Sequence, residues 1–252
     1  MTCPELIAGC EPWSHVAGSS TGVLVVHGFT GCPASVRGVA DELADAGFDV
    51  EVPRLPGHGT TVEDMLGTRW DDWFVEVEAA YEALAARVQR LIVIGQSMGA
   101  TLALALAQRH RSIDGVLCIN PLTQLRDDET MAMIAEYIED GFAVVPGEGS
   151  DIADPDSSDI SYPGTPLPPL QSLLLDGVAS VTAGFDTMTM PLRLLTSRQD
   201  HVVAPADSEY LAATWGGDVE HTWLERSFHV ATRDFDRDVV HAACVAFVRG
   251  LS

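Results

Sequence analysis

Ser97 lies between two glycines, at a point where an apolar run gives way to an alanine- and leucine-rich stretch. Residues 91–101 read LIVIGQSMGAT, so a Gly-x-Ser-x-Gly motif falls at residues 95–99. A serine on a sharp turn between a strand and a helix needs small neighbours, because chain segments approach closely there. The helix that follows offers free N–H groups that could stabilise an oxyanion. These features predict that Ser97 is a nucleophile.

A serine hydroxyl becomes a good nucleophile only when a base takes its proton and an acidic group orients that base. Asp200, in LLTSRQDHVVAP, follows one predicted strand, and His229, in ERSFHVAT, follows the next. Both side chains should therefore lie at the same sheet edge as Ser97. We predict that His229 is the general base and that Asp200 orients it.

The other histidines and two further acids are weaker candidates. His201 adjoins Asp200 but precedes the next strand, which makes it a poor base. Asp207 falls inside a predicted helix and Asp186 precedes its strand, so neither is favoured as the orienting acid. The remaining histidines are interpreted as structural or solvated: His15, His27, His58, His110, His221 and His241.

Two main-chain amides are candidates for an oxyanion hole. In sites of this kind, one donor follows the nucleophile and the other lies in the loop after an earlier strand. Met98 and Phe29, the latter within HGFTG at residues 27–31, occupy these places. An ordinary turn between a strand and a helix is the alternative interpretation of HGFTG.

Short apolar runs alternate with helical patterns along most of the chain, which favours parallel strands joined by crossover helices. Strands are predicted at residues 23–26, 48–52, 91–94, 115–119, 191–196 and 219–224. Helices are predicted from residue 33 to about residue 47 and over residues 70–88, 98–110, 205–215 and 234–248. In such sheets the functional residues lie at the carboxyl ends of the strands.

Residues 121–186 interrupt this alternation. They contain a helical pattern at 127–140, a second predicted helix at 170–181, and a stretch without periodicity at 146–169. We expect a single domain over residues 1–252 in which 121–186 is inserted as a cap, or lid, over the sheet edge; a disordered surface loop is the alternative. Apolar cap residues could line an acyl pocket or only pack the cap onto the sheet: Met131, Ile134, Ile138, Leu170, Leu173 and Leu174.

Six motifs together carry a family resemblance that spans nearly the whole chain from about Val23. They are HGFTG (27–31), RLPGHG (54–59), DDW (71–73), GQSMG (95–99), SRQDHVVAP (197–205) and SFHV (227–230). Their combination resembles the small bacterial carboxylesterases and monoacylglycerol lipases of the α/β-hydrolase superfamily, in which the triad order is also Ser, Asp, His.

The resemblance implies an α/β-hydrolase fold: a mostly parallel sheet with helices on both faces and a small cap insertion. It also implies Ser97, His229 and Asp200 as the catalytic triad and the amides of Phe29 and Met98 as oxyanion donors. Two features depart from the family pattern. Only about twenty residues precede the first clear strand, so early antiparallel strands should be shortened or missing. The acidic, proline-rich middle of the insertion fits no substrate-binding pattern that we identify.

The expected activity is hydrolysis of carboxylic esters, such as monoacylglycerols or short- to medium-chain acyl esters, through an acyl-enzyme intermediate. No metal or organic cofactor is expected. A thioesterase or an amidase would use the same residues, and a non-catalytic binding protein with this fold is a further alternative. The sequence leaves the oligomeric state open.

Composition excludes several other classes of function. Asp and Glu number 37 against 14 basic residues, for a formal charge of −23, so nucleic acid is a poor partner. All the basic residues are arginines. The absence of lysine excludes Schiff-base chemistry on lysine and the phosphate-binding lysine of a P-loop.

The cysteines and the N-terminus suggest a compartment. Cys3, Cys10, Cys32, Cys118 and Cys244 form no Cys-x-x-Cys pair, and their scatter is unlike a secreted disulfide framework, which favours a reducing compartment. The N-terminal MTCPELIAGCEPW has neither the positive stretch of a signal peptide nor an apolar run long enough for a membrane span. A cytoplasmic protein without stable membrane insertion is therefore expected.

Overall fold

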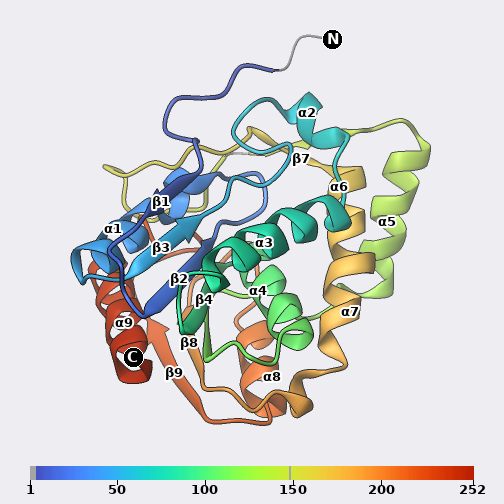
Figure 1. Cartoon of the computed structure of the whole chain (residues 1–252). Helices are drawn as coiled ribbons and strands as arrows, with labels where there is room; N and C mark the ends of the chain where they lie inside the picture. The colour runs from blue at the N-terminus through green and yellow to red at the C-terminus, as the bar shows by residue number, and fades with distance from the viewer. Residues whose placement is uncertain (1–3, 148) are drawn as a thin grey trace.

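The computed structural model describes residues 4–147 and 149–252. Within these residues, seven strands form one twisted sheet in the order β1-β3-β2-β4-β5-β8-β9 (Figure 1). Neighbouring strands are parallel, except that the edge strand β1 is antiparallel to β3. The strands are β1 Trp13–His15, β2 Thr21–Val26, β3 Asp49–Val52, β4 Arg90–Gln96, β5 Gly115–Ile119, β8 Leu192–Ser197 and β9 Val219–Leu224.

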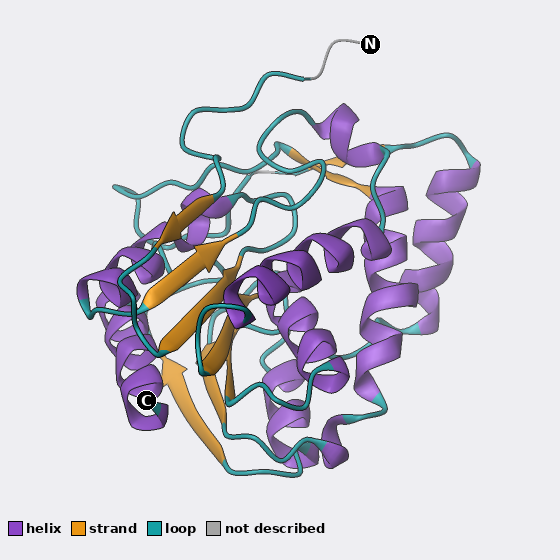
Figure 2. Ribbon diagram, viewed as in Figure 1, coloured by secondary structure: helices purple, strands orange, loops and turns teal. Residues whose placement is uncertain are grey.

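Helices cover both faces of this sheet (Figure 2). One face packs against α1 and α9, and the other against α3, α4 and α8. The α-helices are α1 Arg37–Asp45, α2 Val62–Leu66, α3 Trp70–Ala85, α4 Met98–Arg109, α5 Asp128–Glu139, α6 Leu167–Ser172, α7 Ala179–Thr182, α8 Ala206–Thr214 and α9 Arg237–Leu251. The result is the three-layer α/β arrangement that the alternating sequence pattern predicts.

Residues 23–26 of strand β2 form a continuous apolar run because both faces of the strand are buried. Leu24 and Val26 point into the core beneath α3 and α4, whereas Val23 and Val25 point into the core beneath α1 and α9. Successive side chains of a strand face opposite sides of the sheet, so a strand covered on both faces needs a continuous apolar run. The central strands therefore hold their carboxyl ends in a fixed row.

The predicted strands and helices are confirmed, with shifts of a few residues at their ends. The helix expected to start at Pro33 begins as a 3₁₀ turn, Pro33–Val36, before α1. The single early antiparallel strand, β1, is only three residues long, as the short N-terminal stretch suggested. Helix α2 was not predicted, because five residues are too few to show helical periodicity.

The inserted residues 121–186 contain more regular structure than predicted. Helix α5 is followed by a two-stranded antiparallel sheet of β6 (Val144–Pro146) and β7 (Gly164–Pro166). The helix expected at 170–181 is instead α6, a π-helical turn (Leu173–Val178) and α7 in succession. Figure 1 shows these helices beside α3 and α4, at one side of the main sheet.

A disulfide bond joins Cys10 to Cys32, and this finding corrects the expectation drawn from the cysteines. The two residues are 22 positions apart, and folding brings the N-terminal segment against the loop after β2. The cysteine argument for a reducing compartment therefore fails. Cys118 and Cys244 are buried free thiols whose pKa values are raised by burial, which makes them unreactive. Cys3 lies outside the described residues.

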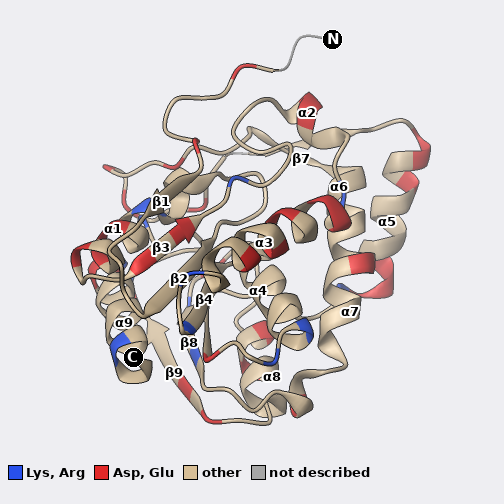
Figure 3. Cartoon of the chain, in the orientation of Figure 1, with Lys and Arg blue, Asp and Glu red and all other residues tan. Residues whose placement is uncertain are grey.

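Acidic residues occur on several helices, among them α1, α3 and α5 (Figure 3). Together with the net charge of −23, these residues should repel polyanions.

Among the helices of the described residues, none has both the length and the apolar composition that crossing a membrane requires.

Candidate active site

Ser97 occupies a strained turn between β4 and α4. Its backbone angles are φ 55° and ψ −121°, a conformation that side-chain-bearing residues rarely adopt. The flanking glycines make the turn possible. A Cβ on Gly95 would overlap the carbonyl oxygen of Gly99, and a Cβ on Gly99 would overlap the carbonyl oxygen of Val26. The motif therefore packs α4 directly onto the central strands and holds the serine at their end.

His229 connects Ser97 to Asp200 through two hydrogen bonds. Its Nε2 lies 2.9 Å from Ser97 Oγ, and its Nδ1 lies 2.7 Å from Asp200 Oδ2. Because a carboxylate only accepts hydrogen bonds, Nδ1 carries the hydrogen and Nε2 is free to take the serine proton. The three side chains predicted to act together are thus brought together.

Asp200 is itself fixed by the loop that carries it. Its Oδ1 accepts hydrogen bonds from the main-chain N–H groups of Val202 and Val203, both at 2.8 Å. The side chain is 1% exposed. Water therefore competes little for the carboxylate, and its second oxygen remains directed at the His229 ring.

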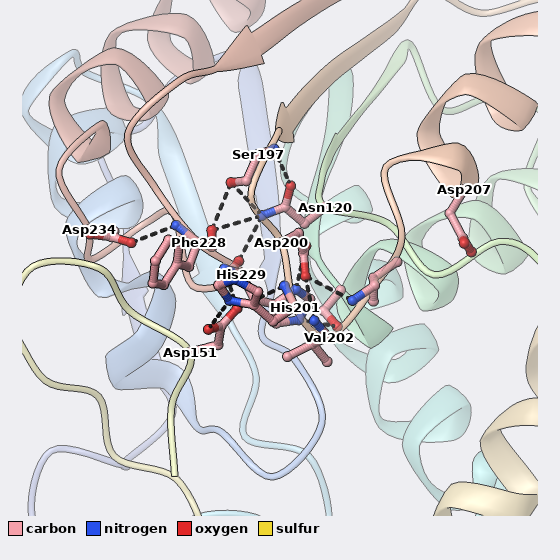
Figure 4. A network of polar contacts seen from close by, with 12 residues as sticks. Asn120, Asp151, Ser197, Asp200, His201, Val202, Asp207, Phe228, His229 and Asp234 are labelled. Carbon is pink, nitrogen blue, oxygen red and sulfur yellow. Dashed lines mark hydrogen bonds and ion pairs between the residues drawn. The ribbon is translucent and has the colours of Figure 1, made fainter. Parts of the chain in front are cut away.

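Asn120, which the sequence analysis missed, holds the main chain of His229. It follows β5 with φ 46°, and its Nδ2 donates to the carbonyl oxygen of His229 at 2.8 Å. The same side chain contacts Ser197 at the end of β8, donating to its Oγ and accepting from its N–H. Figure 4 shows Asn120 between these two segments. Its position directly after a buried strand was the signal that could have identified it.

The two predicted oxyanion donors both lie near Ser97: Met98 follows it in the chain, and Phe29 lines the same pocket. Met98 begins α4, so its N–H is among the donors that a helix leaves free at its start. Phe29 lies in the loop after β2, and that loop runs close to the nucleophile: a Cβ on Gly28 would be 3.3 Å from Ser97 Cβ. Phe29, Gly28 and Ser97 all line one pocket.

Two buried histidines support this loop. His27 Nδ1 donates to the carbonyl oxygen of Gly28 at 3.0 Å, and its Nε2 accepts from the N–H of Leu55 at 3.2 Å. His58 Nδ1 donates to the carbonyl oxygen of Pro56 at 3.0 Å. Burial lowers the pKa of His27 to about 3 and that of His58 to about 4. Both rings are therefore neutral structural groups, as the sequence analysis expected.

The alternative candidates for the orienting acid and the base make other contacts. Asp207 accepts hydrogen bonds from the N–H groups of Thr123 and Gln124 and so attaches the start of the insertion to α8. Asp186 is exposed in a 3₁₀ turn at residues 185–187. His201 contacts Asp151, at 2.9 Å, rather than Ser97.

Most of the residues that line the pocket beside Ser97 have polar side chains. Asp159 is the most buried acid in its lining: Oδ2 accepts from Ser35 Oγ at 2.7 Å, and burial raises the pKa of this carboxyl group. Its Oδ1 is buried, has no hydrogen-bond partner among the described residues, and lies 3.6 Å from Arg233 Nε. The other polar lining residues include Thr30, Ser35, Gln96, Ser150, Asp151, Ser161 and Thr165.

The six apolar residues proposed for an acyl pocket pack elsewhere. Ile134, Leu173 and Leu174 are buried in the core beneath α3 and α4, and Met131, Ile138 and Leu170 pack against that core. In the part of the chain that the structure describes, none of the six lines the pocket beside Ser97. Packing the insertion onto the sheet, the second of the two alternatives, is their observed role.

The acidic segment, which we define as residues 149–163, supplies much of the pocket wall. Gly149, Ser150, Asp151, Asp159 and Ser161 line the pocket. The segment was predicted only as an aperiodic stretch of the insertion. Its aspartates resemble those of any exposed loop, so the sequence offered no signal that would separate Asp151 and Asp159 from the others.

Comparison with known proteins agrees with this arrangement of fold and site. The model of the alpha/beta hydrolase fold family matches residues 22–158. The chain belongs to this family, and it is a hydrolase.

Individual relatives cover almost the whole chain. A thermostable monoacylglycerol lipase from Bacillus sp. (strain H-257) is 36% identical, over 93% of this chain and 92% of the relative. A carboxylesterase from Bacillus subtilis (strain 168) is 26% identical, over 93% and 94% of the two chains. A solved structure from work on the metagenome-derived lipolytic enzymes LipS and LipT is 36% identical with a TM-score of 0.92, covering 98% of this chain and 100% of that chain.

Proposed function

We propose that the protein is a serine esterase that hydrolyses carboxylic esters with Ser97 as nucleophile, His229 as general base and Asp200 as its orienting acid. The observation that carries this proposal is the continuous hydrogen-bonded path from Asp200 through His229 to Ser97, with 2.7 and 2.9 Å between the bonded atoms. The strained turn at Ser97 supports it, because such strain is typical of functional positions.

The reaction proceeds by acyl transfer. Ser97 Oγ attacks the ester carbonyl carbon while its proton passes to His229 Nε2, and the N–H groups of Phe29 and Met98 stabilise the tetrahedral oxyanion. Collapse of this intermediate breaks the ester C–O bond, and the departing alcohol oxygen takes the proton from His229. Water then attacks the acyl carbon, His229 takes its proton, and collapse releases the acid and returns the proton to Ser97. Asp200 stabilises the imidazolium in both halves.

The substrates we favour are monoacylglycerols and other short- to medium-chain esters. A pocket lined by hydroxyl groups and by the buried Asp159 suits an alcohol that carries several hydroxyl groups, because each hydroxyl can donate one hydrogen bond and accept another. The Bacillus monoacylglycerol lipase, at 36% identity, supports the same substrate class.

We further propose that the chain is a single domain in which residues 121–186 form a cap. The acidic segment lies within these residues and contributes Ser150, Asp159 and Ser161 to the pocket wall. Substrate would therefore bind between the ends of the sheet strands and the inserted segment.

Initial hydrolysis rates on a chain-length series of simple esters and matched monoacylglycerols test the proposal. Ser97→Ala should lower kcat by about 10⁴-fold or more, and Ser158→Ala, at an exposed serine of the acidic segment, should leave it unchanged. Highest rates on monoacylglycerols would define a monoacylglycerol lipase, and highest rates on simple esters a general carboxylesterase. Failure to detect Ser97-dependent turnover on either set would contradict an esterase and redirect the test to thioesters and amides.

A further inference from the structure

Asp151, from the acidic segment, contacts both loops that carry the His–Asp pair of the site. Its Oδ2 accepts from the main-chain N–H of His229 at 3.1 Å and from that of His201 at 3.2 Å. Its Oδ1 lies 2.9 Å from His201 Nδ1. Its own carbonyl oxygen accepts from the N–H of Val230 at 3.0 Å. One residue thus bridges the loop after β8 and the loop after β9, as Figure 4 shows.

These contacts fix the peptide groups on both sides of the base. The N–H of His229 is bound by Asp151, and its carbonyl oxygen is bound by Asn120. The backbone of His229 is therefore held from opposite directions, which leaves only the side-chain torsions free. Asp200 directly precedes His201 in the chain. Because the Asp151 carboxylate accepts from the N–H of His201, it also restrains the backbone beside the orienting acid.

We propose that Asp151 is a positioning residue for the base: its carboxylate holds the loops of Asp200 and His229 at the separation that the hydrogen-bonded path to Ser97 requires. This inference rests on the proposed function. Its physical basis is the sensitivity of proton transfer to geometry, since a displacement of about 1 Å in a reacting group costs about 100-fold in rate.

The main-chain contacts carry this role, and the contact to the His201 ring adds little. The His201 side chain is 60% exposed, so its pairing with Asp151 is screened by water. The Asp151 side chain is 17% exposed and faces inward to the two N–H groups. Replacing the carboxylate by an amide should therefore preserve the role, because an amide oxygen still accepts both N–H groups.

The acidic segment has attachments besides Asp151, so the loss of this side chain should have a local effect. Asp234 accepts from the N–H groups of Ala153 and Asp154 at 2.8 and 2.9 Å. Ser157 donates to the carbonyl oxygen of Arg233 at 2.6 Å, and Tyr162 donates to that of Gly57 at 2.7 Å. A variant at position 151 should keep the segment, and with it the pocket wall, in place.

Steady-state kinetics of three variants test the proposal. Asp151→Ala should lower kcat by about 10- to 100-fold with KM within about twofold of wild type. Asp151→Asn should retain most of kcat. Asp156→Ala is the matched control, since it removes the same charge from an exposed position of the same segment and should change neither constant. A raised KM with unchanged kcat would overturn the proposal, because Asp151 would then affect only the binding of substrate in the pocket that it lines.

A second measurement is independent of turnover. The hydrogen between His229 Nδ1 and Asp200 should give a far-downfield proton resonance, which Asp200→Asn would remove and so identify. We expect Asp151→Ala to shift or broaden this signal, and Asp151→Asn and Asp156→Ala to preserve it. An Asp151→Ala protein with wild-type kcat and an unchanged signal would overturn the proposal. If the wild-type protein hydrolysed no ester in a Ser97-dependent way, the proposed function would fail, while this signal would still decide the role of Asp151.

Discussion

The turn that carries Ser97 and the acidic segment that reaches His229 meet at one pocket, yet they are held by different forces. At the turn, Gly95 and Gly99 allow main chain to pack directly against main chain. The acidic segment is held instead by hydrogen bonds between side chains and main chain. Asp151 and Ser157 bind main-chain groups of other loops, and Asp234, outside the segment, accepts from the N–H groups of Ala153 and Asp154.

The position of the nucleophile and the position of the pocket wall are therefore fixed by different interactions. Packing of backbone against backbone tolerates no added atom, because interiors are filled to the density of organic crystals. Hydrogen bonds at a partly exposed loop can be removed one at a time, and each contributes only a modest free energy. The nucleophile should therefore be rigid in its position, whereas the wall of the pocket should be adjustable.

The largest effect is expected from Gly99→Ala. The new methyl group would overlap the carbonyl oxygen of Val26, and neither backbone segment can move without disturbing the sheet. We expect the free energy of unfolding to fall by more than about 3 kcal/mol and hydrolysis to fall with it, measured by urea unfolding and kcat/KM. Gly250→Ala is the control, because no atom lies within 4 Å of the added Cβ. Wild-type stability in Gly99→Ala would show that the turn is not held by close packing.

The second largest effect is expected when the pH is lowered, which should reduce the free energy of unfolding. His27 and His58 have pKa values lowered to about 3 and about 4 in the folded protein, against about 6.5 for histidine in an unfolded chain. Between these values the unfolded chain binds protons that the folded chain does not, so stability is complete above pH 6.5 and falls as the pH falls. At pH 5, each histidine should lower the free energy of unfolding by about 2 kcal/mol.

His58→Asn isolates this effect. An asparagine amide can still donate to Pro56 but does not titrate, so the free energy lost between pH 7 and pH 5 should be about 2 kcal/mol smaller than in wild type. His15→Asn, at the partly exposed edge strand, should leave the loss unchanged. Urea unfolding at the two pH values makes the measurement. Equal stability of the wild-type protein at pH 7 and pH 5 would contradict the neutral buried pair.

The same difference explains what the sequence could predict. The placement of Ser97, Asp200 and His229 at one edge of the sheet was predictable, because regular alternation of strands and helices puts the carboxyl ends of parallel strands in one row. Asp151 was not, since its partners lie 50 and 78 residues away and nothing local distinguishes it from neighbouring aspartates. The bond between Cys10 and Cys32 escaped for the same reason. Periodicity predicts elements, but single contacts between loops depend on the completed fold.

The smallest expected effect tests whether the acidic segment can open locally while the sheet stays folded. Ser157 Oγ makes one hydrogen bond, at 2.6 Å, to the carbonyl oxygen of Arg233. Removing it in Ser157→Ala should cost about 1 kcal/mol of local stability, which corresponds to about fivefold faster opening. Amide hydrogen exchange at Ala153 and Asp154 should accelerate by that factor, while the unfolding midpoint stays at the wild-type value.

Ser158→Ala, at the exposed neighbouring position, should exchange as wild type does. If Ser157→Ala instead lowered the unfolding midpoint and accelerated exchange in β4 and α4 equally, the segment and the sheet would unfold as one cooperative unit. The pocket wall would then be as rigid as the nucleophile, and adjustment to different alcohols would have to come from side chains alone. Independent opening of residues 149–163 would instead allow the wall to fit alcohols of different size while the triad keeps its geometry.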